Sequence, residues 1–176
     1  MHALKIFISF NVFFYCFCIV SYGQELQLSF RRNSFFAEYA LEGPDYSVNY
    51  DRIFARSEAF NFSFRAGISI LNNQLALPLG LNVFTGKKIH HAELSFTATP
   101  LVIKHAPVNG GYADSDKMVN LFPGVGYRYQ KSSGGIFFRV IAGPLIILDP
   151  PSGDFWNMDP SVRFSFVAGM GFSFGK

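Results

Sequence analysis

Cysteine and charge are both scarce in this sequence. Only two of the 176 residues are cysteines, Cys16 and Cys18, and both lie near the N-terminus. The rest of the chain can therefore form neither a disulfide nor a thiolate metal site. Charged residues make up 15% of the chain, whereas ordinary soluble domains contain about 25%. The net charge of +3 is too small to indicate a nucleic-acid partner.

Long apolar runs are also missing beyond the first 24 residues. A membrane helix needs about 18 uninterrupted apolar residues, so no later segment is a candidate for one. Apolar residues are nevertheless abundant, at 49% of the chain, and 22 residues are Phe. This composition excludes a disordered chain, because disordered chains are poor in apolar residues. The length allows one domain.

The N-terminal segment predicts a signal peptide. Lys5 supplies a positive charge, residues 6–20 form an apolar run, and Ser21 and Gly23 are small residues at the −3 and −1 positions of a cleavage site. We expect cleavage after Gly23, so that residues 1–23 are the signal peptide and residues 24–176 are one exported domain. An uncleaved anchor helix is the alternative interpretation.

Motifs for phosphate binding, serine hydrolysis and zinc proteolysis are absent from the sequence. His90 and His91 are the most suggestive metal-binding pair. Because neighbouring side chains of a strand point to opposite faces, these two cannot chelate one ion together. We therefore predict no metal site and no cofactor.

Paired with Ser95 or Ser132 as a nucleophile, His105 would suggest a membrane acyl-hydrolase. Ser95 lies ten residues along the same predicted strand, and Ser132 belongs to the opposite rim. Neither is within the hydrogen-bond reach that a nucleophile and its base require. Asp114 and Asp116 lack the Gly and Glu of a full calcium loop. The prediction is a protein that is not an enzyme.

Alternation of apolar and polar residues is the strongest positive signal. From Phe60 to Ile70, even positions are apolar and odd positions are polar or small, which is typical of a strand with two different faces. Comparable alternation occurs at 35–40, 46–51, 75–84, 92–99, 121–130, 136–143 and 162–174. Together these segments predict an all-β fold, an eight-stranded antiparallel up-and-down barrel.

The composition of the two faces predicts which one points outward. The apolar face carries large residues, which would overfill an eight-stranded lumen, whereas the other face is rich in Gly, Ser and Ala. A soluble, lipocalin-like barrel would have the opposite orientation. We therefore predict a transmembrane barrel. Side chains expected to contact lipid are Phe62, Phe64, Leu79, Phe96, Phe164 and Phe166.

Charges of both signs fall on the face predicted to line the lumen. A lone buried charge is costly, so these side chains must pair with one another. The predicted lumen charge network, with a structural role, consists of Glu38, Asp51, Arg65, Glu93, Arg128, Arg139 and Arg163. Strand proximity makes Arg65 and Arg128 the candidate partners of Glu93.

The lengths of the connections predict the orientation of the barrel. Short turns at 53–59, 86–89 and 131–134 alternate with two long connections at 105–118 and 149–160. Outer-membrane barrels have short periplasmic turns and longer extracellular loops. The long connections are therefore the predicted sites for any extracellular partner. Aromatic residues expected at the periplasmic rim are Tyr50, Tyr127, Tyr129, Phe172 and Phe174.

Several short motifs are similar to a known family. They are Gly126-Tyr127-Arg128-Tyr129-Gln130, Gly134-Gly135-Ile136-Phe137-Phe138-Arg139, Pro144-Leu145, Tyr50-Asp51-Arg52, Pro78-Leu79-Gly80-Leu81-Asn82 and Gly86-Lys87-Lys88. Over most of residues 24–176 the chain resembles a widespread family of small outer-membrane β-barrel proteins of Gram-negative bacteria. The resemblance implies a membrane barrel in the cell envelope but no reaction. Members usually end on an aromatic residue that the insertion machinery reads, whereas here Gly175 and Lys176 follow Phe174.

These observations favour a non-enzymatic, integral outer-membrane protein that is structural or mediates interactions through its extracellular loops. Its expected partners are outer-membrane lipid and, during assembly, the barrel insertion machinery, and we expect a monomer that binds no nucleic acid. A narrow, porin-like conduit and a lipid-modifying outer-membrane enzyme are the alternatives, and a soluble ligand-binding barrel of lipocalin type is a further one.

Overall fold

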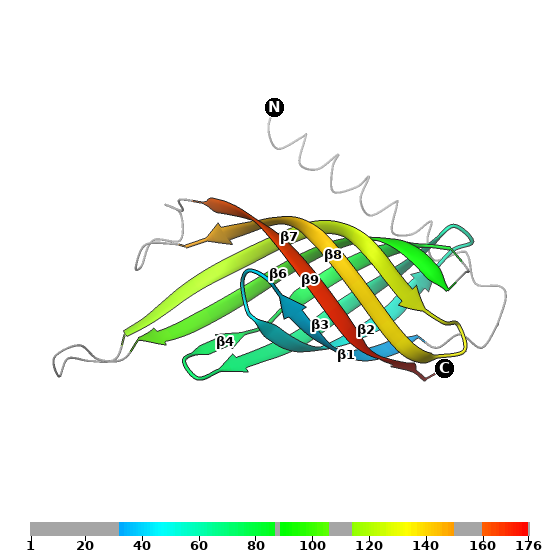
Figure 1. Ribbon diagram of the computed structural model, residues 1–176, viewed down its shortest axis with the longest axis horizontal. Helices are drawn as coiled ribbons and strands as arrows, with labels where there is room; N and C mark the ends of the chain where they lie inside the picture. The colour runs from blue at the N-terminus through cyan, green and yellow to red at the C-terminus, as the bar shows by residue number, and fades with distance from the viewer. Residues whose placement is uncertain (1–31, 87–88, 106–113, 150–159, 176) are drawn as a thin grey trace, which may run out of the picture.

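The computed structural model of the protein describes residues 32–86, 89–105, 114–149 and 160–175. These residues form one β-barrel (Figure 1). The predicted signal peptide, residues 1–23, lies outside the described residues. No helix among the described residues is long and apolar enough to cross a membrane.

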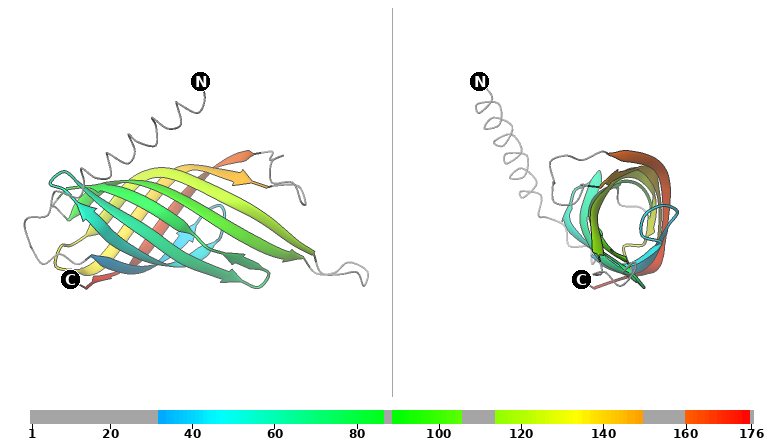
Figure 2. Two further views of the ribbon diagram at one scale, coloured as in Figure 1. Left: turned by 180° about the vertical axis from the view of Figure 1, so that it is seen from behind. Right: turned by 90° about the vertical axis from the view of Figure 1, so that its left-hand side faces the viewer.

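Every strand of the barrel pairs antiparallel with its neighbours. The strands are β1 (Asn33–Ala40), β2 (Tyr46–Arg56), β3 (Phe60–Leu71), β4 (Gln74–Ala76), β5 (Leu79–Thr85), β6 (His90–His105), β7 (Asp114–Gln130), β8 (Gly135–Leu148) and β9 (Ser161–Phe174). Their order is β2-β1-β9-β8-β7-β6-β4-β3-β5, and the pairings β2–β3 and β6–β5 close the ring. Seen end-on, the strands form a closed ring (Figure 2).

Strands β4 and β5 together form one wall of the barrel. Both lie between β3 and β6, where the sequence predicts a single strand at 75–84. The interruption falls at Leu77 and Pro78, because proline has no N–H to donate to a neighbouring strand. The backbone carbonyl of Pro78 still accepts a hydrogen bond from the N–H of Gly67 at 2.8 Å. The barrel therefore has eight walls, as the alternation predicts.

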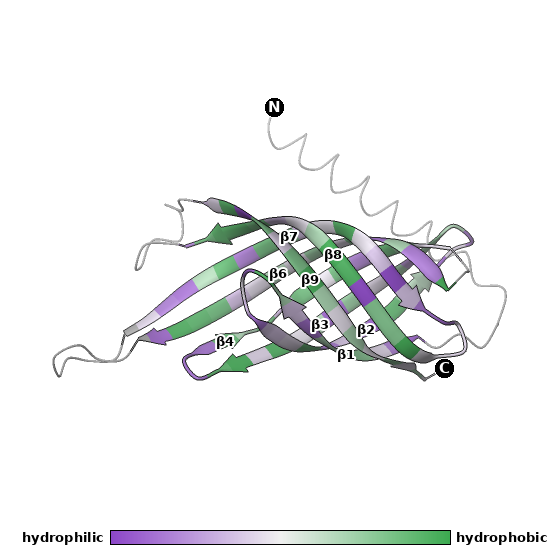
Figure 3. Cartoon of the chain, viewed as in Figure 1, coloured by the Kyte–Doolittle hydropathy of each residue, from purple (hydrophilic) through white to green (hydrophobic). Residues whose placement is uncertain are grey.

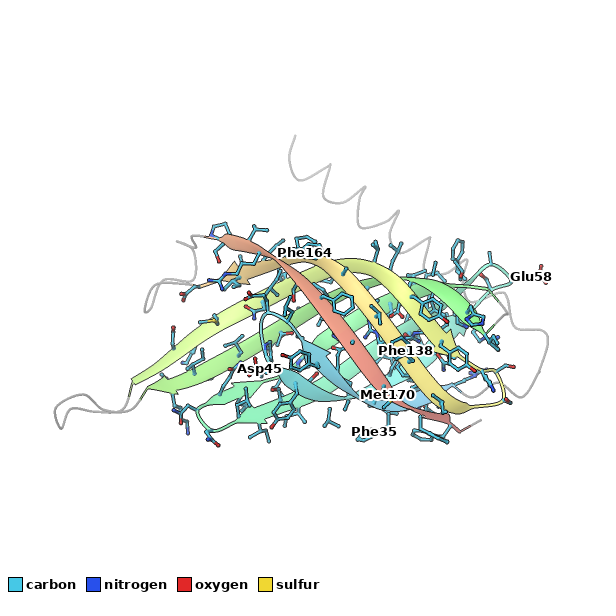
Figure 4. The ribbon with its side chains drawn as sticks, in the orientation of Figure 1. Phe35, Asp45, Glu58, Phe138, Phe164 and Met170 are labelled. Carbon is cyan, nitrogen blue, oxygen red and sulfur yellow. The ribbon has the colours of Figure 1, made fainter. Side chains whose placement is uncertain are left out.

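The predicted facing of the strands is confirmed. Hydrophobic and hydrophilic positions alternate along the strands (Figure 3), and large apolar side chains are exposed on the outside of the barrel. Figure 4 shows Phe35, Phe138, Phe164 and Met170 projecting from its surface, and Phe164 is 70% exposed. Polar side chains at the alternate positions are buried inside. The outward apolar rows contradict the lipocalin-like arrangement, which needs them in the core.

Glycine on the inner face lets neighbouring backbones approach closely. A Cβ built on Gly126 would lie 1.9 Å from the carbonyl oxygen of Val140 on β8, which no real side chain tolerates. This crowding gives a physical reason for a small residue at an inward position of β7.

The two ends of the barrel differ. At the end where β1 begins and β9 ends, called here the terminal end, the connections at 86–89 and 131–134 have the predicted bounds, whereas the turn predicted at 53–59 spans 57–59 because β2 continues to Arg56. At the opposite end, called here the mouth, the walls are uneven. Strand β1 has 8 residues, whereas β6 has 16 and β7 has 17. Figure 1 shows the β6–β7 hairpin extending well beyond the β1–β2 turn.

The connection predicted at 105–118 is shorter than expected. Residues Leu101 to His105 pair with residues Asp114 to Met118, so both strands continue beyond their predicted ends and the connection spans 106–113. The connection predicted at 149–160 has the expected bounds, because β8 ends at Leu148 and β9 begins at Ser161. Residues 106–113 and 150–159 lie outside the described residues.

Candidate functional site

Among the described residues, the buried charged side chains lie in the barrel interior. Strands β1, β2, β3, β6, β7 and β8 each direct one charged side chain inward. These are Glu38, Asp51, Arg65, Glu93, Arg128 and Arg139, each at most 8% exposed. Three are acids and three are arginines, so the charges of this set balance. The period of two explains the placement, because each residue occupies an inward position of its strand.

The charge pairs nearest the mouth involve Glu38. Its Oε1 atom forms an ion pair with Nη1 of Arg65, and its Oε2 atom lies 3.2 Å from Nη1 of Arg139. Nη2 of Arg65 also donates a hydrogen bond to Oγ1 of Thr97 at 2.8 Å. One carboxylate therefore connects arginines of β3 and β8 across the lumen.

Glu93 occupies the middle of the barrel. Its Oε1 atom lies 3.0 Å from Nη2 of Arg139, and its Oε2 atom lies 2.8 Å from Nε of Arg128. All three side chains are at most 1% exposed. Such charge-assisted hydrogen bonds are stronger than bonds between neutral groups. Glu93 therefore joins the mouth side of the interior to the terminal side.

Asp51 is the last acid toward the terminal end. Its Oδ2 atom lies 3.1 Å from Nη2 of Arg128 and accepts hydrogen bonds from Oγ of Ser63 at 2.8 Å and Nδ2 of Asn82 at 2.9 Å. The interior charges thus follow one another with alternating sign. This series, called here the charge chain, runs Arg65, Glu38, Arg139, Glu93, Arg128, Asp51.

Arg163 lies outside the charge chain, which corrects its predicted place in the lumen network. Its Nη1 atom is 3.3 Å from Oε2 of Glu42, and the two side chains are 60% and 38% exposed. The reason is the uneven mouth. Strand β1 ends at Ala40, which pairs with Val167, so at Arg163 strand β9 has β8 as a neighbour on one side but lacks β1 on the other.

The partners of Glu93 were only partly predicted. Arg128 is a partner, whereas Arg65 pairs with Glu38 and Arg139 takes the second place beside Glu93. Arg128 and Arg139 are opposite each other in the β7–β8 register. Because these two arginines occupy paired positions of the same face, one acid between them can bond to both. Strand register is therefore the signal that would have indicated their shared acid, Glu93.

Aromatic side chains close the interior toward the terminal end, and the sequence reasoning did not assign them a role. The rings of Phe36 and Phe137 are 4.8 Å apart. The guanidinium carbon of Arg128 lies 4.2 Å from the centre of the Phe84 ring, a distance at which a cation and an aromatic face attract. The rings of Phe36, Phe84 and Phe137 therefore pack against the arginines of the charge chain and fill the lumen beside them.

A small cavity lies inside the barrel near the mouth. Its volume is about 40 Å³, and it is called here the cup. Phe122, Leu145 and Val167 form an apolar wall, whereas Glu38 and Arg65 line it from the charge chain. The cup has space for only a few water molecules.

The two neighbouring histidines point to opposite faces, as predicted. His91 is 1% exposed and packs against the ring of Phe84, at 5.1 Å between ring centres. His90 is outside, with its Nδ1 atom 2.5 Å from the hydroxyl of Tyr127. Within the described ranges, no group of three or more His, Cys, Asp or Glu side chains is placed to hold a metal ion.

The serines considered for a hydrolase are also placed by the structure. Oγ of Ser95 donates a hydrogen bond to Oδ1 of Asn82 at 2.7 Å and accepts one from Nη2 of Arg139 at 3.2 Å, so it belongs to the interior polar network. Ser132 lies in the turn between β7 and β8, at the terminal end. The side chain of His105 lies outside the described part of the chain.

No protein-family model matches the sequence, and no curated protein matches it either. Among solved structures, the barrel is similar to the N-terminal β-barrel domain of Pseudomonas aeruginosa OprF. The TM-score is 0.46 and the sequences are 11% identical, over 81% of this chain and 96% of that chain.

Proposed function

We propose that this chain is an integral outer-membrane β-barrel protein without enzymatic activity, which is structural or mediates interactions through its mouth. The observation that carries the proposal is the outer surface. Large apolar side chains face outward on every wall. Examples from successive walls are Phe35, Val48, Phe64, Leu81, Leu94, Val125, Phe138 and Met170, which are 37–68% exposed. In water such a surface would drive aggregation, whereas in lipid it is the favourable one.

The backbone of the barrel suits the same environment. A lipid core offers no hydrogen bonds, so only helices and closed barrels can span it. Strands β8 and β9 have 14 residues each, more than the roughly 9–11 residues that a tilted strand needs to cross. Tyr50, Tyr129 and Phe172 lie near the terminal end, where they support an interfacial aromatic girdle.

The connections support an orientation with the terminal end in the periplasm. There the turns at 57–59, 86–89 and 131–134 are short, as periplasmic turns are. The connections at 106–113 and 149–160, together with the paired ends of β6 and β7 within the predicted segment 105–118, would then lie on the extracellular side and offer the surface for an extracellular partner. We further propose export by the signal peptide at 1–23, assembly by the barrel insertion machinery, a monomer surrounded by outer-membrane lipid, and membership of the small Gram-negative barrel family that the motifs resemble.

The filled interior favours a structural protein over a conduit. Three acids and three arginines occupy the middle of the lumen, and Phe84 and Phe137 pack against Arg128. An eight-stranded barrel has an interior only wide enough for side chains. The ion pairs of the charge chain therefore connect six of the walls across the lumen and stabilise the barrel from inside.

The test is expression of the full chain in a Gram-negative host, followed by separation of the two membranes. We expect the protein in the outer-membrane fraction, with a gel mobility that changes on boiling and a mature N-terminus at Gln24. Recovery as a soluble periplasmic protein would overturn the proposal.

A further inference from the structure

The turn between β1 and β2 folds across the mouth of the barrel. Gly43, at the centre of the turn, has φ +96°, and a Cβ built on it would lie 3.6 Å from Nδ2 of Asn120 on β7 and 3.7 Å from Cδ2 of Leu145 on β8. Neither β7 nor β8 is a neighbour of β1 or β2 in the sheet. Residues 41–45 therefore cover the cup, and they are called here the lid.

Few contacts hold the lid closed. The N–H of Leu41 donates to the carbonyl oxygen of Phe166 at 2.9 Å. The N–H of Glu42 donates to Oγ of Ser165 at 3.2 Å, and this hydroxyl donates to the carbonyl oxygen of Glu42 at 3.3 Å. The carboxylate of Glu42 pairs with Arg163, where both side chains are exposed. Exposed ion pairs contribute little to stability. The lid is thus attached to β9 through one short segment that can separate without disturbing the charge chain.

Two buried polar atoms on residues that line the cup have no hydrogen-bond partner. They are Nε of Arg65, a donor, and Oδ1 of Asn120, an acceptor. The two residues are 4% and 3% exposed, and unpaired polar atoms at such depth are unfavourable. A hydroxyl group both donates and accepts a hydrogen bond, so it suits a site with one unpaired donor and one unpaired acceptor.

The charges around the cup restrict the ligand further. Glu38 and Glu42 both line the cavity, and the terminal nitrogens of Arg65 are already bonded to Glu38 and Thr97. An anion would meet two carboxylates and only one free N–H. The apolar wall of Phe122, Leu145 and Val167 favours an alkyl segment beside the polar group. The preferred ligand is therefore neutral and amphipathic.

The low wall beside the lid provides a lateral route to the cup. Beyond the pair of Ala40 with Val167 and the backbone hydrogen bond from Leu41 to Phe166, strand β9 extends without β1 as a neighbour. Around this gap the outward side chains are apolar and prominent. Leu41 is 64% exposed, Val162 is 64% exposed and Phe164 is 70% exposed. A molecule dissolved in the outer leaflet would meet this gap first, a step that rests on the proposed membrane location.

We propose that the cup is a binding site for a small neutral amphiphile with a hydroxyl group, such as a long-chain alcohol, and that residues 41–45 are its lid. The hydroxyl enters the cup toward Arg65 and Asn120, and the alkyl chain leaves through the gap above β1. Because the lumen is filled beneath Glu38, the site is a dead end that binds a molecule without passing it on.

The probe is 1-decanol, added to the full mature chain in lipid nanodiscs and followed by methyl NMR. We expect saturable shifts at Leu145 and Val167, whereas Leu94 and Val125, on the outer surface, report general partitioning into lipid. The methyl ether of decanol cannot donate, and decanoate is an anion. Each should bind about fivefold or more weakly, as expected for the loss of one hydrogen bond.

Three variants make the test specific. Asn120→Leu removes the acceptor while keeping the volume, and should weaken decanol binding about fivefold. The matched change Asn72→Leu, in the exposed β3–β4 turn, should leave binding unchanged. The double variant Glu42→Cys with Ser165→Cys should lose binding when oxidised and recover it with reductant, because the crosslink holds the lid shut.

Each outcome has a separate meaning. Equal shifts with all three probes, or unchanged binding by Asn120→Leu, would overturn the site, provided the methyl spectrum shows a folded barrel. Unchanged binding by the oxidised double variant would overturn the lid. A chain that binds decanol in nanodiscs but fractionates away from the outer membrane would overturn the proposed function and leave the site in place.

Discussion

Replacing Glu93 by Gln removes one charge from the middle of the charge chain. In the native protein this carboxylate contacts both Arg128 and Arg139 at 2.8–3.0 Å, and its side chain is fully buried. The variant keeps the volume and shape of the side chain. Its interior retains two acids, Glu38 and Asp51, for three arginines, so one positive charge is left without a counterion in a medium of low dielectric constant.

Removing one member of a buried ion pair typically costs about 3–5 kcal/mol. Here Arg128 keeps Asp51 and Arg139 keeps Glu38, so we expect the lower part of that range, about 3 kcal/mol. Glu42→Gln is the matched control, because it breaks a pair whose members are 38% and 60% exposed. Exposed pairs contribute about 0–1 kcal/mol.

The measurement is equilibrium urea unfolding of both variants in lipid vesicles, followed by far-ultraviolet circular dichroism. A second variant, Glu93→Gln with Arg139→Gln, restores the balance of charge and should be more stable than the sum of its single changes predicts. If Glu93→Gln and Glu42→Gln have equal, small effects, Glu93 faces open water and the closed polar lumen is wrong.

Three further predictions concern the outer surface, the strand packing and the lumen. Leu94→Arg should impair assembly, because an arginine on the lipid side near the membrane centre costs about 2–4 kcal/mol. The control Asp45→Arg, in the exposed lid, should be tolerated. Equal yields of folded barrel for the two variants, scored by gel mobility, would contradict lipid contact at Leu94. Gly126→Ala should lower the free energy of unfolding by about 1–3 kcal/mol, because its new Cβ would lie 1.9 Å from the nearest atom. Gly80→Ala should lower it less, because there the nearest atom is 3.1 Å away. The same urea titration checks this order. Purified protein should give no steady current in planar bilayers, and reproducible single-channel steps would refute the filled lumen.

The facing of the strands followed from the sequence because one face is nearly uniform in chemistry. Where Phe64 and Leu94 alternate with Arg65 and Glu93, a shift of one residue would reverse every side chain. The pattern therefore determines the facing of each strand without knowledge of its partners. The short turn at 131–134 followed similarly, because the alternation of apolar and polar residues stops there. In the structure Gly134 of this turn has φ +85°.

The pairing of interior charges could not be derived in the same way. Whether Glu93 meets Arg65 or Arg139 depends on strand register and on the reach of long side chains across the lumen. Arg163 shows the same limit, because its inward position buries it only if a neighbouring strand encloses it, and β1 ends too early. The length of β6 was underestimated because residues 101–105 pair along their whole length with β7 while the pattern of alternation weakens there.

The charge chain requires a lumen filled by side chains, whereas the cup is a cavity in the same lumen. A chain of six alternating charges is stable only if each carboxylate oxygen and guanidinium nitrogen finds a partner, which requires walls close enough to fill the interior. Around Asp51 this condition is met, since its carboxylate also accepts hydrogen bonds from Ser63 and Asn82, whereas Nε of Arg139, in the middle of the chain, has no partner. At the mouth the chain ends on Arg65, whose Nε has no partner. The wall is low there because β1 stops at Ala40. The same early end of β1 that exposes Arg163 thus leaves space beneath the lid, next to the Glu38 and Arg65 end of the charge chain.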